Sequence, residues 1–200
     1  KEHSFDTTDI ADAIAGADGS DWVEKIRNAL EGIDLAYSLT ILTDDGRVFG
    51  LRCPSGTWPL WVGETDDEFV IASETRVEKA LEGKKVSWRE VKPGELVEIT
   101  SDQIISRQIF SPSREAVCLL HAIYGAKEDA LMTEDGITYK EFRRKMGQIL
   151  AKEHPIEADL YIGIPSTGID IAAGYAEALG VVTSDDVIKL KEERNGESKA

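Results

Sequence analysis

The sequence predicts an α+β domain followed by the beginning of an α/β domain. Short segments in which apolar and polar residues alternate fill residues 35–100, and turn residues separate them, as in antiparallel sheets. Apolar residues at helical spacing precede this region, at residues 10–30. After residue 158 the pattern becomes a buried strand, a tight polar loop and a helix, which is the repeating unit of a parallel-sheet fold.

The composition is that of a globular protein with an excess of acid. Two hundred residues, 42% of them hydrophobic and 30% charged, allow one large or two small domains with a core. The formal net charge of −15 argues against nucleic acid or anionic membrane as a partner. No apolar run reaches membrane-spanning length, and the first residues lack the apolar core of a signal peptide. Two cysteines make no disulfide framework, so we expect a cytoplasmic protein.

Apolar spacing in the first half of the sequence predicts helices at residues 10–14 and 22–30, with Ser20 as the N-terminal cap of the second helix. A short helix is expected at residues 77–81. Asp44-Asp45-Gly46 predicts a hairpin turn. The predicted strands are residues 35–41, 47–51, 60–62, 69–72, 86–91 and 96–100.

The second half contains one long helix, opened by a capping box at Thr138 and Glu141 and stopped by Pro155. Polar residues around Pro112 place the domain boundary there. The predicted buried stripe of the helix is Phe142, Met146, Ile149 and Leu150. The residues predicted to face solvent are Arg143, Arg144, Lys145 and Lys152.

Residues 158–180 carry the strongest chemical pattern of the chain. A buried strand at Leu160–Ile164 leads into the loop Pro165–Gly168 and a helix that Gly180 closes. Free backbone N–H groups at a helix N-terminus, beside the hydroxyls of Ser166 and Thr167, suit a phosphate or carboxylate. The alternative is an ordinary turn in which one hydroxyl caps the helix, and the local sequence alone favours the cap.

Four phrases in order carry a resemblance: AYSLTILTDDGRVFGLR, PSGTWPLWVG, VIASET and VKPGELVEI. They resemble the later part of the glutaminase domain of the amidophosphoribosyltransferase family. The loop and helix PSTG, AA and GYA, at residues 165–176, resemble the opening of that family's phosphoribosyltransferase domain. The resemblance runs from Ser4 to Lys189. It implies the C-terminal part of an Ntn-hydrolase αββα domain at residues 1–112. An interdomain helix and the start of a type I phosphoribosyltransferase domain then follow at residues 113–200.

The resemblance implies that glutamine and phosphoribosyl pyrophosphate give phosphoribosylamine, glutamate and pyrophosphate, a glycosyl transfer of purine synthesis. Asp6 then binds the ammonium group of glutamine, and Thr167 lies near a Mg²⁺ ion that accompanies phosphoribosyl pyrophosphate. The residues implied in binding that substrate are Ser166, Thr167, Gly168 and Lys189. The family also implies purine nucleotides as ligands and a homo-oligomer.

Several departures from the family limit this expectation. Its nucleophile is an N-terminal cysteine, whereas this sequence begins with Lys1, so we assign no catalytic residue and expect an incomplete piece that is inactive alone. Cys53 and Trp58 replace an acid and an arginine of the family. By the resemblance, Cys118 falls on the position of an iron–sulfur ligand in some members of the family. A cluster needs four thiolates and the sequence has two cysteines, which favours Cys118 as a small buried apolar side chain. The alternative function is a non-catalytic relative that binds nucleotide or phosphate as a regulatory module.

Overall fold

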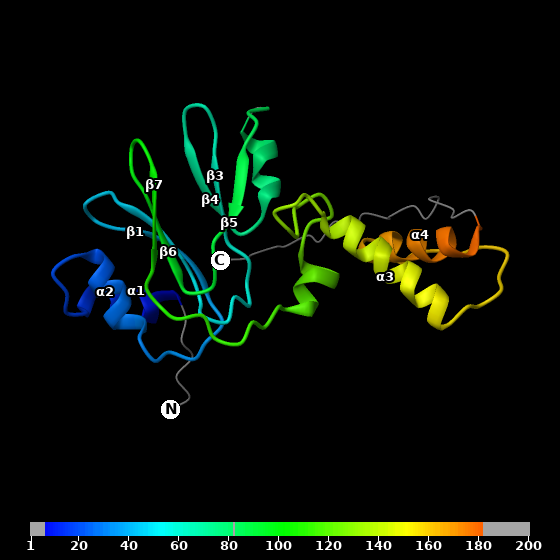
Figure 1. Ribbon diagram of the computed structural model, residues 1–200, viewed down its shortest axis with the longest axis horizontal. Coiled ribbons are helices and arrows are strands. Elements are labelled where there is room, and N and C mark those ends of the chain that lie inside the picture. Colours follow the sequence, from blue (N-terminus) through cyan, green and yellow to red (C-terminus); the bar gives the residue numbers. More distant parts are fainter. Residues whose placement is uncertain (1–6, 82, 182–200) are drawn as a thin grey trace, which may run out of the picture. The chain divides into compact units, whose positions relative to one another are not determined.

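The computed structural model describes residues 7–81 and 83–181, and the chain divides into two compact units, residues 1–118 and 119–200. The first unit contains helices and β-strands, and the named elements of the second unit are helical (Figure 1). The elements of the first unit are α1 (Thr7–Gly16), α2 (Trp22–Leu30), β1 (Ser38–Leu42), β2 (Val48–Arg52), β3 (Trp61–Glu64), β4 (Phe69–Ala72), the 3₁₀ helix η1 (Thr75–Ala80), β5 (Ser87–Glu90), β6 (Glu95–Ile99) and β7 (Ile104–Gln108).

Two antiparallel sheets form the first unit. One has the strand order β1-β2-β6-β7 and the other β4-β3-β5. The predicted hairpin turn is present, with the N–H of Gly46 donating to the carbonyl of Thr43 (3.0 Å), and β1 and β2 pair antiparallel on either side of it. The layered arrangement of antiparallel strands with helices, predicted from the alternating segments, is therefore confirmed.

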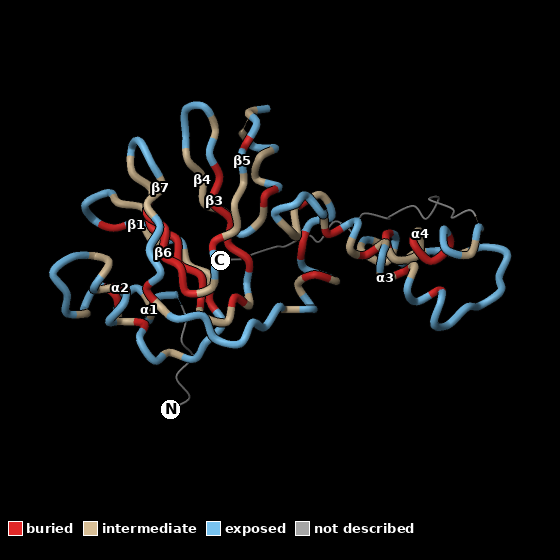
Figure 2. Tube along the Cα trace, viewed as in Figure 1, coloured by how far each residue is buried: buried red, intermediate tan, exposed pale blue. Residues whose placement is uncertain are grey.

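Strand alternation builds the layers of this unit. On β2 and β6, Phe49, Leu51 and Leu96 point to the side of α1 and α2, where they form one core cluster with Ile14 and Ile26. Val97, the neighbour of Leu96, points to the other side and packs with Leu60 and Val62 in a second cluster. Figure 2 shows buried stretches along β3 and β6, and β2 is buried from Phe49 to Arg52. The order of layers is helices, first sheet, second sheet.

Three details of the first unit differ from the prediction. β7 was not predicted, because its apolar residues stand only at its start; it is an edge strand paired with β6 alone. β1 begins at Ser38 rather than at residue 35, which shortens the predicted strand. The cap of α2 is Asp21, whose side chain accepts the N–H of Glu24 (2.9 Å), whereas Ser20 donates its N–H and hydroxyl to the Glu24 carboxylate.

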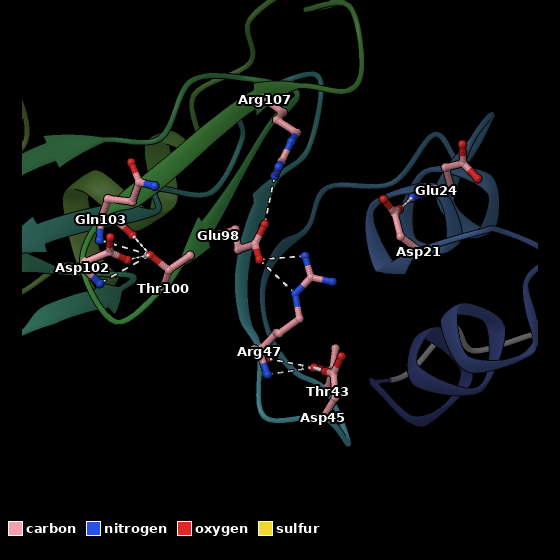
Figure 3. Close-up of polar contacts among 10 residues, drawn as sticks. All are labelled: Asp21, Glu24, Thr43, Asp45, Arg47, Glu98, Thr100, Asp102, Gln103 and Arg107. Atoms are coloured by element: carbon pink, nitrogen blue, oxygen red, sulfur yellow. Dashed lines mark hydrogen bonds and ion pairs between the residues drawn. The ribbon is translucent and has the colours of Figure 1, made fainter.

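Side-chain hydrogen bonds connect β6 to both of its neighbours in the first sheet. The carboxylate of Glu98 on β6 accepts bonds from Arg47, the residue before β2 (2.7 Å), and from Arg107 on β7 (2.9 Å) (Figure 3). Arg47 also lies over the ring of Phe49, with 4.9 Å from its guanidinium carbon to the ring centroid. Glu98 is buried and both arginines are partly exposed. The three side chains together link β6 to β7 and to the start of β2.

The second unit consists of the short helical turn η2 (His121–Gly125), α3 (Tyr139–Glu153) and α4 (Thr167–Leu179). The capping box at Thr138 and Glu141 is confirmed, and α3 ends before Pro155 as predicted. α3 and α4 cross at two glycines. A Cβ on Gly147 would lie 1.9 Å from the carbonyl oxygen of Ile171, and one on Gly174 would lie 1.9 Å from that of Arg144. Only glycine permits so close a contact between the two backbones.

Two predictions about the second unit are wrong. Arg143 is not solvated but 1% exposed, and the buried residues of α3 are Tyr139, Arg143, Gly147 and Ala151. Ile149 and Leu150, which the pattern places in the buried stripe, are 46% and 44% exposed. The glycine crossing rotates the face with Arg143 and Gly147, not the apolar stripe, toward α4. The predicted buried strand Leu160–Ile164 is also absent from the described residues. A strand needs a paired neighbour, and Leu160, Ile162 and Ile164 are 49%, 54% and 82% exposed.

Among the described helices, none combines the length and the apolar character that crossing a bilayer requires.

Candidate functional site

The loop Pro165–Gly168 enters α4 directly. Ser166 takes the capping position of α4, and within the described residues its side chain makes no capping hydrogen bond. The Pro165–Ser166 peptide bond is cis. Ser166 is exposed and Thr167 is half-buried. The capping role that the local sequence favoured is therefore not what the Ser166 hydroxyl does, and the hydroxyl stays available at the helix N-terminus.

The loop forms one wall of an open cavity of about 670 Å³. Its lining residues are Ile123, Tyr124, Leu150, Tyr161, Ile162, Gly163, Ile164, Pro165, Ser166, Thr167, Gly168, Ile171, Ala172 and Tyr175. Among them, Ser166 and Thr167 carry aliphatic hydroxyls, three are tyrosines, and the others are glycine, proline or aliphatic residues. Gly163 lies against the loop, since a Cβ there would come within 2.4 Å of the Gly168 carbonyl oxygen. A cavity of this kind suits a ligand with one anionic end.

Tyr175 anchors the segment that leads into the loop. Its hydroxyl donates to the carbonyl of His154 (2.7 Å) and accepts the N–H of Ile156 (2.8 Å). Tyr161 adds a third bond, from its hydroxyl to the carbonyl of Ile156 (2.5 Å). Tyr175 thus bonds α4 to the backbone at the end of α3, at His154 and Ile156. Sequence reasoning placed Tyr175 only within a family phrase and did not predict this role.

A buried ion pair lies one turn behind the loop. Arg143 of α3 donates to the carbonyls of Ala122 (3.1 Å) and Ala126 (2.6 Å), and its Nη1 lies 3.8 Å from Oδ2 of Asp170. Asp170 stands in the first turn of α4 and is 5% exposed. Within the described part of the chain, Oδ2 of Asp170 accepts no hydrogen bond. Burial raises the pKa of Asp170, Glu128 adds to the rise, and Lys140, Arg143 and Arg144 oppose it.

The sequence contains one indication that Asp170 has a buried partner. Asp170 is the single acid in the otherwise apolar first two turns of α4, where a charge is rarely buried without a partner. The run of cations Arg143, Arg144 and Lys145 predicts a solvent-facing surface and so gives Arg143 no buried partner. Only the crossing of α3 and α4 brings it to Asp170.

The other predicted site residues do not gather at this loop. Asp6 and Lys189 lie outside the described residues. Cys118 is half-buried at the end of the first unit, where its N–H donates to the carbonyl of Thr57 (3.4 Å). No group of three or more His, Cys, Asp or Glu suited to a metal occurs within residues 7–81 and 83–181. Two cysteines in the whole sequence also do not make up the four thiolates of an iron–sulfur cluster.

Cys53, which replaces an acid of the family, is fully buried in the core cluster between the first sheet and its helices. Its Sγ lies 3.3 Å from the hydroxyl of Ser55. The preceding Arg52 holds the loop by donating to the carbonyls of Trp58 (3.0 Å), Val91 (2.9 Å) and Gly56 (2.8 Å). Cys53 is therefore a packing residue of the core, and Arg52 fixes the loop through its hydrogen bonds to backbone carbonyls.

Comparison with known proteins gives one consistent result. The chain is 38% identical over 167 residues to the amidophosphoribosyltransferase of Archaeoglobus fulgidus, covering 84% of this chain and 35% of that protein. It is 36% identical to the amidophosphoribosyltransferase of Synechocystis, covering 92% of this chain and 38% of that protein. No family model matches the chain.

Solved structures agree with the sequence relatives. The glutamine phosphoribosylpyrophosphate amidotransferase of Bacillus subtilis, solved with ADP and GMP, superposes with a TM-score of 0.81 at 31% identity, over 90% of this chain and 39% of that one. A structure described as the allosteric regulatory enzyme of purine biosynthesis also gives a TM-score of 0.81, at 29% identity over 92% of this chain and 40% of that one.

The sequence relatives are amidophosphoribosyltransferases by name, one solved relative is a glutamine phosphoribosylpyrophosphate amidotransferase, and the similarity extends over both units. Over the region that it spans, the chain belongs to the amidophosphoribosyltransferase family. It spans 35–39% of the length of the curated relatives that it matches.

Proposed function

We propose that this chain is the part of an amidophosphoribosyltransferase that joins the glutaminase domain to the phosphoribosyltransferase domain. The complete enzyme would convert glutamine, water and phosphoribosyl pyrophosphate into phosphoribosylamine, glutamate and pyrophosphate. The helix–sheet–sheet layers of the first unit support assignment to part of an Ntn-hydrolase αββα domain. The loop and α4 support assignment of the second unit to the start of a type I phosphoribosyltransferase domain, with the boundary near Pro112.

The observation that carries the phosphate-binding proposal is the uncapped start of α4. Ser166 and Thr167 present two hydroxyls at a helix N-terminus, and the side chain of Ser166 is not used as a cap by the described residues. Backbone N–H groups there favour an anion. We assign Ser166, Thr167 and Gly168 to the pyrophosphate group of phosphoribosyl pyrophosphate, with Asp6 and Lys189 retained as proposals from the family resemblance.

Magnesium fits this site only as a companion of the ligand. Mg²⁺ prefers six oxygen ligands and in such sites takes several of them from phosphates and water. Of the two loop hydroxyls beside the proposed phosphate position, we assign that of Thr167 to Mg²⁺. Bound there, Mg²⁺ would neutralise phosphate charge, while Thr167 would hold the complex in register with the helix N-terminus.

The experiment that tests the loop is calorimetric titration of the chain with Mg²⁺-pyrophosphate. Thr167→Val keeps the shape of the side chain and removes the hydroxyl, so we expect affinity to fall by about tenfold, as for one lost hydrogen bond to a charged group. Thr40→Val is the matched control, because Thr40 is exposed on β1 in the first unit. Equal affinity of Thr167→Val and the wild type would contradict the assignment and return the loop to a structural turn.

A second candidate function is a non-catalytic module that binds nucleotide or phosphate for regulation. The burial of Cys53 in the core, in place of a family acid, favours it, because this position keeps the fold without the acid. Titration with GMP, ADP, glutamine and phosphoribosyl pyrophosphate separates the two functions, because only the enzyme part is expected to bind phosphoribosyl pyrophosphate. A module would bind a purine nucleotide without glutamine, whereas an enzyme part would bind phosphoribosyl pyrophosphate at the loop.

A further inference from the structure

The ion pair Arg143–Asp170 differs from the other arginine–carboxylate pairs of the described residues in its burial on both sides. Arg143 is 1% exposed and Asp170 is 5% exposed. In the pairs Arg47–Glu98, Arg89–Glu95 and Arg107–Glu98 the arginine is at least one-third exposed. Water can therefore compensate those arginines, but it cannot compensate Arg143.

The geometry of the pair is loose for such a buried position. The two charged atoms are 3.8 Å apart, and Oδ2 of Asp170 accepts no hydrogen bond from any described residue. Arg143 gives its hydrogen bonds to the carbonyls of Ala122 and Ala126 instead. A short bidentate bond would be the usual way to fix two elements together. Asp170 thus acts on Arg143 mainly by its charge.

The position of the pair relative to the loop gives that charge a function. Asp170 lies three residues after Thr167, about 4.5 Å along the helix axis, so both charges are close to the start of α4. Neither Arg143 nor Asp170 lines the cavity, so both would act on an anion at Ser166–Gly168 through their charge and not by contact. With both groups ionised, the pair adds no net charge to the field at the loop.

We propose that Asp170 is a charge-setting residue for the anion loop: it neutralises buried Arg143, and so limits how tightly the loop holds pyrophosphate. This inference rests on the proposed phosphate-binding function of the loop. The consequence is that binding remains weak enough for pyrophosphate to leave. Asp170 does not line the cavity. It is therefore not a catalytic residue, and it acts on the loop only through the charge of Arg143.

The test is a double-mutant cycle on the full 200-residue chain, with Mg²⁺-pyrophosphate as the probe at pH 8 and an ionic strength of about 0.1 M, where the screening length is about 10 Å. Asp170→Asn leaves Arg143 uncompensated, so affinity should rise about threefold to tenfold. Arg143→Gln leaves the carboxylate alone, so affinity should fall by a similar factor. The double variant removes both charges and should bind within about twofold of the wild type.

The matched control is Glu177→Gln, which changes the net charge as Asp170→Asn does. Glu177 stands on the same helix, about 15 Å beyond Thr167, and its exposed carboxylate lies beyond the screening length of the loop. Its affinity should equal that of the wild type. Circular dichroism and thermal unfolding establish that each variant is folded. If Asp170→Asn does not fold, Asp170→Ser removes the same charge and has the same expected result.

A purely structural role for the pair predicts a different order, in which every variant binds more weakly than the wild type. Asp170→Asn with unchanged or lower affinity would overturn the inference while leaving the loop assignment intact. Absence of pyrophosphate binding by the wild type contradicts the proposed function and the inference with it. The two failures are therefore distinguishable in one series of titrations.

Discussion

At the scale of single residues, three buried charges are held in three ways. Arg52 gives its donors to backbone carbonyls and pairs with Glu90, 2.9 Å away. Glu98 accepts bonds from two partly exposed arginines. Arg143 has backbone carbonyls and the loosely placed Asp170. Removing a partner is costly only where the remaining charge stays out of water, which makes Glu98 the more tolerant position and Arg143 the less tolerant one.

Glu98→Gln should therefore lower the free energy of unfolding by about 1–2 kcal/mol at pH 7, because Arg47 and Arg107 are exposed enough to regain water. Burial on its own would raise the pKa of Glu98, but hydrogen bonds from Arg47 and Arg107 outweigh it and lower that pKa. A lowered pKa stabilises the fold above the ordinary value of 4.5, and this contribution disappears as the pH falls through the folded-state pKa.

The measurement is urea unfolding of the wild type and Glu98→Gln between pH 3 and 8. The difference between them should be constant from pH 6 to 8 and shrink below about pH 4.5. Glu157→Gln, an exposed residue of the second unit, should show no such trend. A difference that is independent of pH down to pH 3 would mean that the Glu98 charge contributes nothing.

At the scale of elements, the crossing of α3 and α4 determines where the candidate loop lies. The two helices touch backbone to backbone at Gly147 and Gly174, and Tyr175 ties the connecting segment to α4. These contacts hold α4 against α3, and no strand of the described residues takes part in them. The loop position depends on these contacts more than on its own sequence.

Gly147→Ala should destabilise the chain by about 1–3 kcal/mol, even though alanine is the better helix former by about 1 kcal/mol. The added methyl would meet the carbonyl oxygen of Ile171, a backbone atom that moves only if α4 moves. Thermal unfolding measures the effect, and Gly16→Ala is the control because no atom lies within 4 Å of its added methyl. Greater stability of Gly147→Ala than of the wild type would show that the helices do not cross this closely.

At the scale of the whole molecule, both units match the same family, in the same order along the chain. A shared fold without common ancestry would not produce this sequence identity. The identity of 31–38% extends over both units, and the solved relatives superpose over nine-tenths of the chain. The chain nevertheless spans 35–39% of its curated relatives. Sites built from residues elsewhere in those proteins are therefore outside what these 200 residues can supply.

The isolated chain should hydrolyse glutamine no faster than a buffer control. Cys53 is fully buried beside Ser55, and neither Cys53 nor Cys118 carries the free α-amine that the proposed family nucleophile uses as its base. Ammonia release from glutamine measures this, with Cys53→Ser and Cys118→Ser as controls. Release that Cys118→Ser abolishes would contradict the expectation and identify a different nucleophile.

The sequence by itself determined the elements whose patterns are local: the hairpin turn at residues 44–46, the strand Phe69–Ala72, the capping box at Thr138 and the helix ending at Gly180. Ordered phrases also determined the family. The tertiary structure alone decided which face of α3 is buried, why Ile149 and Leu150 are exposed and why Arg143 meets Asp170. The reason is physical. A turn or cap is satisfied by its own neighbours, whereas a helix face and a buried charge are defined by a partner distant in sequence.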